Sequence, residues 1–387
     1  MSNKSIFLRG LSLFSNIGVA EACLEDIGVN ILLANEIDPD RSKFYEHVYP
    51  KTEVITGDIK RESVYSRIIK KSKEFKIDFV IATPPCQGMS TAGKLDPLDK
   101  RNQLIYYALK IIKNIKPKYA ILENIPQQLK TYISVNNQKL KIPEYIKLEL
   151  SNQYIVNESI VNATDYGVPQ IRRRSIFLLT KKNIENKLNF IEESEKVAPI
   201  NLIDSIGHLP SLDPQIQGFT TKEQLSYFPD YIKKMEKGLM ISKWHRPPVH
   251  KIRHVEVMKY VPEGESALNN KIYYPKNKDG SRIRGYPNTY KRQWWNRPAY
   301  TVTTYNGAIC SHDNVHPGRK IGHDQKGNAI FSDARVLSIY ELMIVMSLPL
   351  NWNIPEWAND SLIRHGIGEG IPPLIIQKIL QKLIDKF

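Results

Sequence analysis

The sequence predicts an α/β fold built on a parallel sheet, joined to a smaller and irregular second part. Three observations carry this prediction. Short apolar segments alternate with segments of helical spacing between Ser5 and Leu122, the alternation ends near Thr180, and the chain closes on an apolar helical pattern at 372–387. Strands that alternate with helices form parallel sheets with helices on both faces.

The expected strands are short and apolar, and most end at an acidic residue, a glycine or a proline. They cover residues 5–14, 30–35, 53–56, 77–82, 119–122 and 175–179. The expected helices repeat apolar residues every three or four positions. They cover residues 20–27, 41–48, 61–71, 102–115 and 372–387. Gly28 is the expected end of the first helix, because glycine adopts the left-handed conformation of helix C-caps.

Length and composition narrow the class of protein. A chain of 387 residues predicts two or three domains. Lys and Arg number 55 against 40 Asp and Glu, and the net charge of +15 favours a polyanionic partner, most simply nucleic acid. The sequence has no apolar run of about 18 residues and no signal-peptide core at its start. Cys23, Cys86 and Cys310 are too few for a disulfide framework or a Cys-rich zinc site. We therefore expect a basic, cytoplasmic protein without a membrane segment.

The second part of the chain mixes cations with aromatic residues. A charged, Asn-rich stretch at 181–195 reads as a linker or surface segment, and no strand–helix alternation follows it up to Gly318. Runs such as Tyr290-Lys291-Arg292 and Trp294-Trp295-Asn296-Arg297 suit contact with nucleic acid through stacking and phosphate pairing. A solvated basic surface has the same composition, so both interpretations stay open at this point.

Polar residues follow the first three strands where each strand ends. Gly18 forms a turn after the first strand, Glu36 ends the second, and Asp58 follows the third. A turn or a helix cap explains each residue alone. Together they favour a nucleoside site, because carboxylates at these positions accept hydrogen bonds from ribose and amino groups. The three-glycine dinucleotide fingerprint is absent.

The segment Pro84-Pro85-Cys86-Gln87-Gly88 follows the strand at 77–82. Ligand sites of open α/β sheets lie at such strand ends, and two prolines hold the following thiol in one orientation. Cys86 is therefore a candidate nucleophile, whereas Cys23 reads as a small buried hydrophobe.

Charged residues of two later strands belong with this thiol. Glu123 ends the next strand and suits an acid or hydrogen-bond donor beside the thiol, although alone it reads as a cap. On an extended segment Gln170, Arg172 and Arg174 share one face and Arg173 points away. The competing interpretation of this run is a basic surface cluster.

In this order, the segments resemble the DNA cytosine-5 methyltransferase family of bacterial restriction-modification systems. The resemblance rests on Phe14–Gly18, Pro85–Gln87, Glu123–Ile125, Tyr166–Pro169 with Gln170–Arg174, Arg297–Thr303, His316-Pro317 and Gly368–Pro373. The chain also departs from the family pattern. Ser12 stands in place of Asp, Asn16 and Val19 replace two glycines, and Glu369 and Gly370 replace Asn and Ala.

The resemblance implies a Rossmann-like, S-adenosylmethionine-dependent methyltransferase domain with a smaller, irregular target-recognition domain. The first would span 1–185, completed by 360–387, and the second 186–359 with the return hinge. Phe14 would pack on the adenine, Glu36 would hold the ribose and Asp58 the adenine amino group. The implied cofactor residues are Phe14, Ile17, Gly18, Glu36, Ile37, Asp58, Ile59, Pro85, Leu104 and Glu369.

The resemblance also implies the chemistry. The target cytosine leaves the duplex stack, Cys86 attacks its C6, Glu123 holds N3 and the amino group, Arg174 holds the O2 side, and Arg172 supports both. The implied DNA contacts are Gln87, Ser90, Lys94, Gln170, Arg292 and Arg297. The product is S-adenosylhomocysteine and no metal is required. We expect a monomer that acts on double-stranded DNA, with a cognate endonuclease acting separately.

Other functions remain open on the sequence. A tRNA cytosine-5 methyltransferase shares the implied fold, but its Cys-Phe-Thr motif is absent here. A catalytically silent DNA-binding relative would not need Cys86, Glu123 and Arg174 together. A dinucleotide-dependent oxidoreductase would carry the missing glycine fingerprint.

Overall fold

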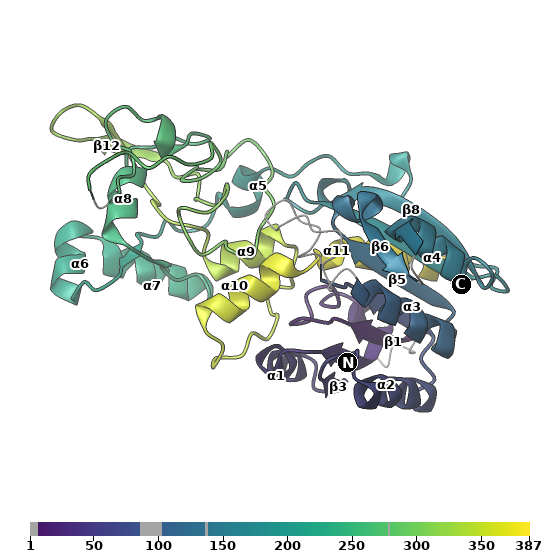
Figure 1. Ribbon diagram of the computed structural model, residues 1–387. Coiled ribbons are helices and arrows are strands. Elements are labelled where there is room, and N and C mark those ends of the chain that lie inside the picture. Colours follow the sequence, from purple (N-terminus) through teal and green to yellow (C-terminus); the bar gives the residue numbers. More distant parts are fainter. Residues whose placement is uncertain (1–6, 86–102, 136–137, 278) are drawn as a thin grey trace.

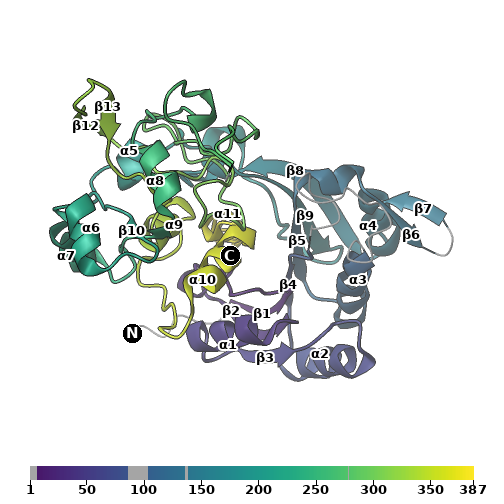
Figure 2. The ribbon, with the colours of Figure 1, turned by 60° about the vertical axis from the view of Figure 1, so that its left-hand side comes forward.

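The computed structural model describes residues 7–85, 103–135, 138–277 and 279–387. A seven-stranded sheet with its helices forms one side of the molecule, and short helices, two-stranded sheets and loops form the other (Figure 1). In both ribbon views, α9 (Ile339–Val345) and α10 (Asp360–Glu369) lie between these two sides (Figure 2). The α/β class predicted from the sequence is confirmed.

The sheet has the strand order β3-β2-β1-β4-β5-β9-β8. Its strands are β1 (Leu8–Leu13), β2 (Val29–Glu36), β3 (Glu53–Thr56), β4 (Phe79–Ala82), β5 (Tyr119–Asn124), β8 (Tyr154–Asn162) and β9 (Arg173–Lys181). The first five are parallel, as predicted, but β9 runs antiparallel to both β5 and β8. The predicted parallel sheet therefore continues into an antiparallel edge formed by β9 and β8. A short connection joins β8 to β9, and only antiparallel neighbours can be joined without a long crossover.

Helices cover both faces of the sheet and fill two cores. On one face pack α2 (Glu62–Glu74), α3 (Leu104–Ile115) and α4 (Ile142–Leu150). On the other lies α11 (Pro373–Ile384), which buries isoleucines and leucines against β1, β2 and β4. The end of the chain thus returns to the sheet formed by its beginning. Helix α1 (Pro39–Val48) follows β2 and buries Phe44 in a third core with α9 and α10.

One predicted helix is wrong. Residues 20–27 form turns that end in the short 3-10 helix η1 (Glu25–Ile27), because the chain must return at once to the start of β2. Gly28 does end this segment in the left-handed conformation, with φ of 78°. Further 3-10 helices are η3 (Pro126–Lys130), η4 (Ala163–Tyr166), η5 (Glu193–Glu195) and η6 (Ala267–Asn269), and a hairpin joins β6 (Tyr132–Val135) to β7 (Gln138–Lys141).

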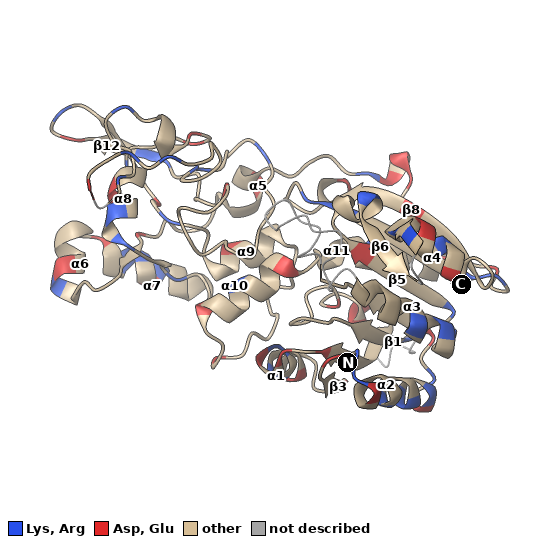
Figure 3. Cartoon of the chain, viewed as in Figure 1, with Lys and Arg blue, Asp and Glu red and all other residues tan. Residues whose placement is uncertain are grey.

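The second side of the molecule is built from short elements. They are α5 (Leu202–Ile206), α6 (Thr221–Tyr227), α7 (Tyr231–Ile241), α8 (Ile252–Met258), β10 (Gln215–Ile216), β11 (Val249–His250), β12 (Lys320–His323) and β13 (Ala329–Phe331). Lys and Arg residues are spread over both sides of the molecule (Figure 3). Across the described residues, no helix combines the length and the apolar character that a bilayer span requires.

Candidate active site

Glu36 is the centre of the predicted cofactor edge. It ends β2, its side chain is buried, and its carboxylate accepts the backbone N–H groups of Asn16, Ile37 and Asp38 at 2.8, 2.9 and 3.0 Å. A carboxylate offers about four acceptor positions, so these donors leave room for a ligand hydroxyl. Burial raises the pKa of Glu36, although the backbone donors and the charge of Arg41 act in the opposite direction.

The turn after β1 has an unusual backbone. Phe14 and Asn16 have φ of 59° and 51°, and Gly18 has φ of 84°. Asparagine tolerates this left-handed region better than most residues, which explains how Asn16 stands where the family pattern has glycine. Gly18 has no such substitute, because a Cβ there would lie 2.2 Å from the ring of Tyr49. The turn therefore presents Phe14, half-buried, at the carboxyl end of β1.

The remaining predicted cofactor residues differ in exposure. Ile17 and Ile59 are buried, whereas Ile37 is 61% exposed. The carboxylate of Asp58 accepts the backbone N–H of Lys60 and lies 3.4 Å from the ammonium of that residue. The parallel register brings the carboxyl ends of β1 to β4 to one edge, so that Phe14, Glu36, Asp58 and Pro85 follow neighbouring strands. Leu104 begins α3 and packs against the first core.

Glu123 and Arg174 form a buried pair on adjacent strands. Nε of Arg174 lies 2.8 Å from Oε1 of Glu123, and the two side chains are 10% and 8% exposed. Burial raises the pKa of Glu123 above its ordinary value, even though the charges of Arg174 and Arg172 act to lower it. A carboxyl with a raised pKa can hold a proton and donate it. This is the arrangement expected of an acid beside a base-binding site.

Cys86 lies outside the described residues, but the segment leading to it is well tied. Thr83 donates its hydroxyl to the carbonyl of Phe14 at 3.2 Å, and Asn124 donates its amide to the carbonyl of Pro84 at 3.0 Å. One contact reaches the cofactor turn and the other reaches the neighbour of Glu123. Residues 83 and 84 are therefore held to both the turn after β1 and the end of β5.

Arg172 is fully buried and holds three backbone carbonyls. It donates Nη1 to Val302 at 2.6 Å and Nη2 to Gly368 and Gly370 at 2.9 and 2.7 Å. Arg173 is exposed, so the predicted alternation is confirmed. Arg172 thereby joins the start of β9 to the end of α10, which is a positioning role.

Two residues expected on DNA are interior residues. Gln170 is fully buried and donates Nε2 to the carbonyl of Val345 at 3.0 Å. Arg292 is also fully buried, and its guanidinium donates to four backbone carbonyls, those of Met258, His316, Ser332 and Asp333. Their donors satisfy the protein's own backbone, which corrects the expectation that they contact DNA. Arg297 is exposed over the ring of Trp294. Gln87, Ser90 and Lys94 lie outside the described residues.

The sequence analysis did not single out two charged residues near the predicted cofactor edge, Glu21 and Arg41. Glu21 accepts a hydrogen bond from the hydroxyl of Ser12 and so supplies a carboxyl near the place where the family pattern has Asp. Burial raises its pKa to about 7. Arg41, in α1, forms a 2.6 Å ion pair with Glu369 at the end of α10. Neither Glu21 nor Arg41 belongs to a motif of the sequence. Their partners lie 9 and 328 residues away along the chain, so no local pattern links them.

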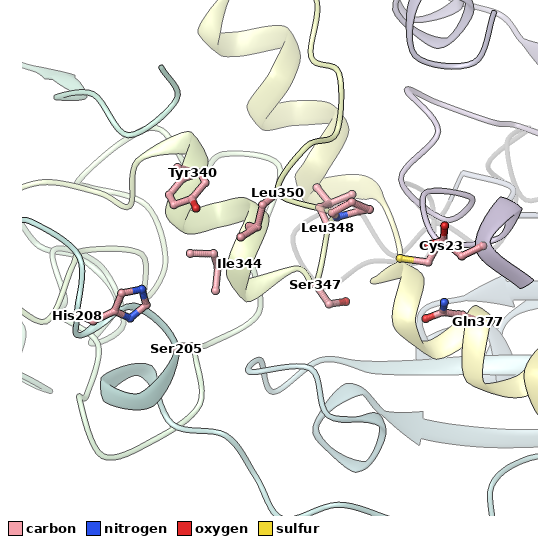
Figure 4. Close-up of a pocket in the computed structure, with 11 residues that line it drawn as sticks. Cys23, Ser205, His208, Tyr340, Ile344, Ser347, Leu348, Leu350 and Gln377 are labelled. Carbon is pink, nitrogen blue, oxygen red and sulfur yellow. The ribbon is translucent and has the colours of Figure 1, made fainter. Parts of the chain in front are cut away.

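A separate hollow of about 500 Å³ lies between the turns after β1 and the helices α5, α9 and α11 (Figure 4). Among the described residues that line it, none belongs to the predicted site. Cys23 faces this hollow and is only half-buried, which corrects its interpretation as a core residue. Within the described ranges, His, Cys, Asp and Glu side chains form no group able to hold a metal.

Comparison with known proteins extends over the whole chain. A family model described as C-5 cytosine-specific DNA methylase matches residues 8–385. The type II methyltransferase M1.HgaI of Avibacterium volantium is 36% identical over 388 residues, which cover 98% of this chain and 99% of the relative. M1.HphI of Haemophilus parahaemolyticus is 26% identical over 382 residues, 97% of this chain and 87% of the relative.

Solved structures show the same fold. A prophage-encoded protein of E. coli assigned as a DNA modification methyltransferase matches with a TM-score of 0.63 and 18% identity, over 98% of this chain and 99% of its own. A DNMT2 variant of Spodoptera frugiperda matches with a TM-score of 0.60 and 15% identity, over 97% and 99%.

Proposed function

Because this chain belongs to the C-5 cytosine-specific DNA methylase family, we propose that its carboxyl edge binds S-adenosylmethionine and that Cys86 attacks the target cytosine. Family membership makes the chain a DNA (cytosine-5)-methyltransferase of the restriction-modification type. The cofactor and the residue roles are the proposed part. One observation carries them: the segment before Cys86 is tied to the cofactor turn on one side and to the strand of Glu123 on the other.

The residues of the carboxyl edge fit the proposed cofactor. Glu36 retains an acceptor position for a ribose hydroxyl. Oδ1 of Asn16 is buried without a hydrogen-bond partner among the described residues, so a ligand with hydroxyl or ammonium donors would satisfy it. Phe14 offers an apolar face for a ring, and Asp58 offers an acceptor. S-adenosylmethionine, when bound there, supplies an electrophilic methyl group.

The protein's residues then carry the bond changes on cytosine. The Cys86 thiolate adds to C6, and the electron pair of the C5–C6 bond is released toward C5 and N3. Glu123 holds N3 and donates its proton as charge develops there, while Arg174 holds the O2 side and fixes the carboxyl of Glu123. C5 would form the new carbon–carbon bond to the methyl group as the methyl–sulfur bond breaks and S-adenosylhomocysteine leaves. A base would then remove the C5 proton, and elimination of the Cys86 thiolate would restore the C5–C6 double bond while the N3 proton returns to Glu123.

We assign the recognition of DNA to the second side of the molecule. Residues 1–185 and 360–387 would form the catalytic domain, and residues 186–359 the target-recognition domain with its return hinge. Arg297 would contact a double-stranded DNA target, because a cation beside an aromatic ring can pair with phosphates while the ring stacks on bases. Gln87, Ser90 and Lys94 would contact the same DNA, as the resemblance implies. We propose a bacterial, cytoplasmic enzyme that acts as a monomer, with its endonuclease partner acting separately.

A covalent trap tests the proposal. Bisulfite sequencing of DNA from expressing cells first identifies the methylated cytosine, and a duplex then carries 5-fluorocytosine at that position. Fluorine cannot leave C5 as a cation, so elimination stalls and a denaturation-resistant adduct should form only when S-adenosylmethionine is added. We expect Cys86→Ala to lose both the adduct and methyl transfer, and Cys23→Ala to keep both. An adduct in Cys86→Ala would refute the role of Cys86.

A further inference from the structure

The end of α10 is wedged between the cofactor turn and the segment that follows Val302. Glycine at three alternate positions permits this approach. A Cβ would lie 2.3 Å from Ile17 at Gly366, 2.2 Å from the carbonyl of Thr303 at Gly368, and 2.5 Å from Val19 at Gly370. The backbone of residues 366–370 therefore lies close to both the turn after β1 and the segment after Val302, and we call these residues the α10 strap.

The strap is anchored by arginines on two sides. Arg172 donates to the carbonyls of Gly368 and Gly370, the residues that flank Glu369. Glu369 itself turns to Arg41 of α1, with 2.6 Å between Nη1 and Oε2 and side chains 27% and 21% exposed. In addition, Asn16 donates its amide to the carbonyl of Gly366 at 2.8 Å. A run of contacts thus leads from the cofactor turn, through the strap, to Arg172.

Arg41 contacts this run at Glu369, and its charge also acts on a second carboxylate, that of Glu36. The described residues show no hydrogen bond or ion pair between Arg41 and Glu36, but the charge of Arg41 acts to lower the pKa of Glu36, against the larger effect of burial. A nearby cation favours the ionised form of a carboxylate. Glu369 replaces the neutral Asn of the family pattern, and Arg41 supplies the cation that this exchange requires.

We propose that Arg41 is a positioning residue of the cofactor site, which steadies Glu36 by its charge and holds the α10 strap to α1 through Glu369. The inference deepens the proposed function, since it names a residue that sets cofactor affinity at the same edge. Without Arg41, Glu369 loses its ion pair and Glu36 loses a nearby positive charge. Glu36 then loses its fixed orientation toward a ribose hydroxyl, and the strap loses its tie to α1.

Isothermal titration with S-adenosylhomocysteine tests this on the free protein, without DNA. We expect Arg41→Gln to weaken binding about fivefold to tenfold, within the range of typical site couplings. KM for S-adenosylmethionine should rise by a similar factor in methylation of unmethylated bacterial genomic DNA, and kcat should stay within about twofold. Arg41→Lys keeps the charge and should stay within about twofold of the wild-type affinity. The control Lys51→Gln breaks an exposed 2.9 Å pair with Glu25 and should bind as the wild type does.

The double variant Arg41→Glu with Glu369→Arg, here called the reversed pair, separates two effects. One is the effect of the positive charge at position 41 on Glu36, and the other is the effect of the ion pair between α1 and the strap. The reversed pair restores an ion pair between α1 and the strap but puts a carboxylate beside Glu36. We expect it to bind S-adenosylhomocysteine no better than Arg41→Gln does. Recovery of wild-type affinity in the reversed pair, or wild-type affinity in Arg41→Gln, would overturn the proposal. Failure of the wild-type protein to bind S-adenosylhomocysteine would instead refute the cofactor assignment itself.

Discussion

Two buried glutamates, one in the large sheet and one in α9 between the two sides of the molecule, each bind an arginine and yet have pKa values shifted in opposite directions. Glu123, in β5, has one Arg174 contact at 2.8 Å, and burial raises its pKa. Glu341, in α9, accepts both Nη groups of Arg335 at 2.7 and 2.9 Å and the backbone N–H of Ser338 at 2.7 Å. Burial alone would raise the pKa of Glu341, but the charges of Arg335 and His316 and the hydrogen bonds from Arg335 together lower it to about 2. The number of donors, not burial alone, decides whether such a carboxyl is kept ionised.

The surroundings of Glu341 show a saturated network. Arg335 also binds Asp333 at 2.8 Å, and Asp333 accepts the backbone N–H of Leu212 at 2.9 Å. Burial lowers the pKa of the adjacent His316 to about 4, so that its ring stays neutral near pH 7. This network joins α9 and the segment before it to Leu212, and its polar groups are already paired with one another. Glu123 has fewer partners, which suits a group that must exchange a proton.

The largest expected effect is the loss of catalysis in Glu123→Gln. Glutamine keeps the shape and a hydrogen-bond donor but cannot transfer a proton to N3. We expect the single-turnover rate with saturating DNA to fall by about 10²–10⁴-fold, as for other general acids, with the melting temperature unchanged or raised. The exposed Glu158 of β8 gives the control Glu158→Gln, which should keep the wild-type rate. Wild-type chemistry in Glu123→Gln would remove Glu123 from the catalytic residues.

In the network around Glu341 we expect a loss of stability, where Glu123→Gln is expected to lose catalytic rate. Arg335→Met leaves Asp333 and Glu341 buried without their cation, and breaking such a pair costs about 3–5 kcal/mol. The free energy of unfolding in urea, followed by tryptophan fluorescence, should fall by this amount. The exposed Arg253 provides the control Arg253→Met, which should change it by less than about 0.5 kcal/mol. A stable Arg335→Met protein would show that the network is dispensable for folding.

The parallel half of the sheet could be predicted from the sequence because its strands are short, rich in apolar residues and followed by a turn signal or an acidic residue. β3 has the predicted bounds, 53–56, and α1 and α3 differ from theirs by about two residues. The outer strand β8 was missed because its residues are mostly half-exposed, with Glu158 and Ile160 exposed, so it lacks an apolar pattern. The short elements of the recognition side lack periodicity for the same reason.

Some residues of the candidate site could likewise be predicted from the sequence and others could not. Residues that end parallel strands, such as Glu36 and Glu123, could be predicted because the edge of a sheet brings them together. The burial of Arg292 could not, since its carbonyl partners come from three distant segments. Ser338 and Glu341 did carry a signal, the Ser-x-x-Glu capping box, which the structure forms at the start of α9. Arg41 and Glu369 meet across 328 residues, beyond the reach of any local pattern.

The smallest expected effect is a pair of opposite pH slopes, measured as the free energy of unfolding between about pH 3 and 7. The folded pKa of Glu341 is lowered, so its contribution to stability is present above the unfolded value near 4.5 and is lost as the pH falls toward about 2. The folded pKa of Glu123 is raised, so its contribution is present below the unfolded value and is lost as the pH rises through the folded pKa. Glu341→Gln should therefore flatten the decline of stability in acid, on a lower baseline. Glu123→Gln should instead remove a decline that appears as the pH rises above about 4.5. Equal slopes in the two variants would contradict the distinction between a saturated carboxylate and one poised to hold a proton.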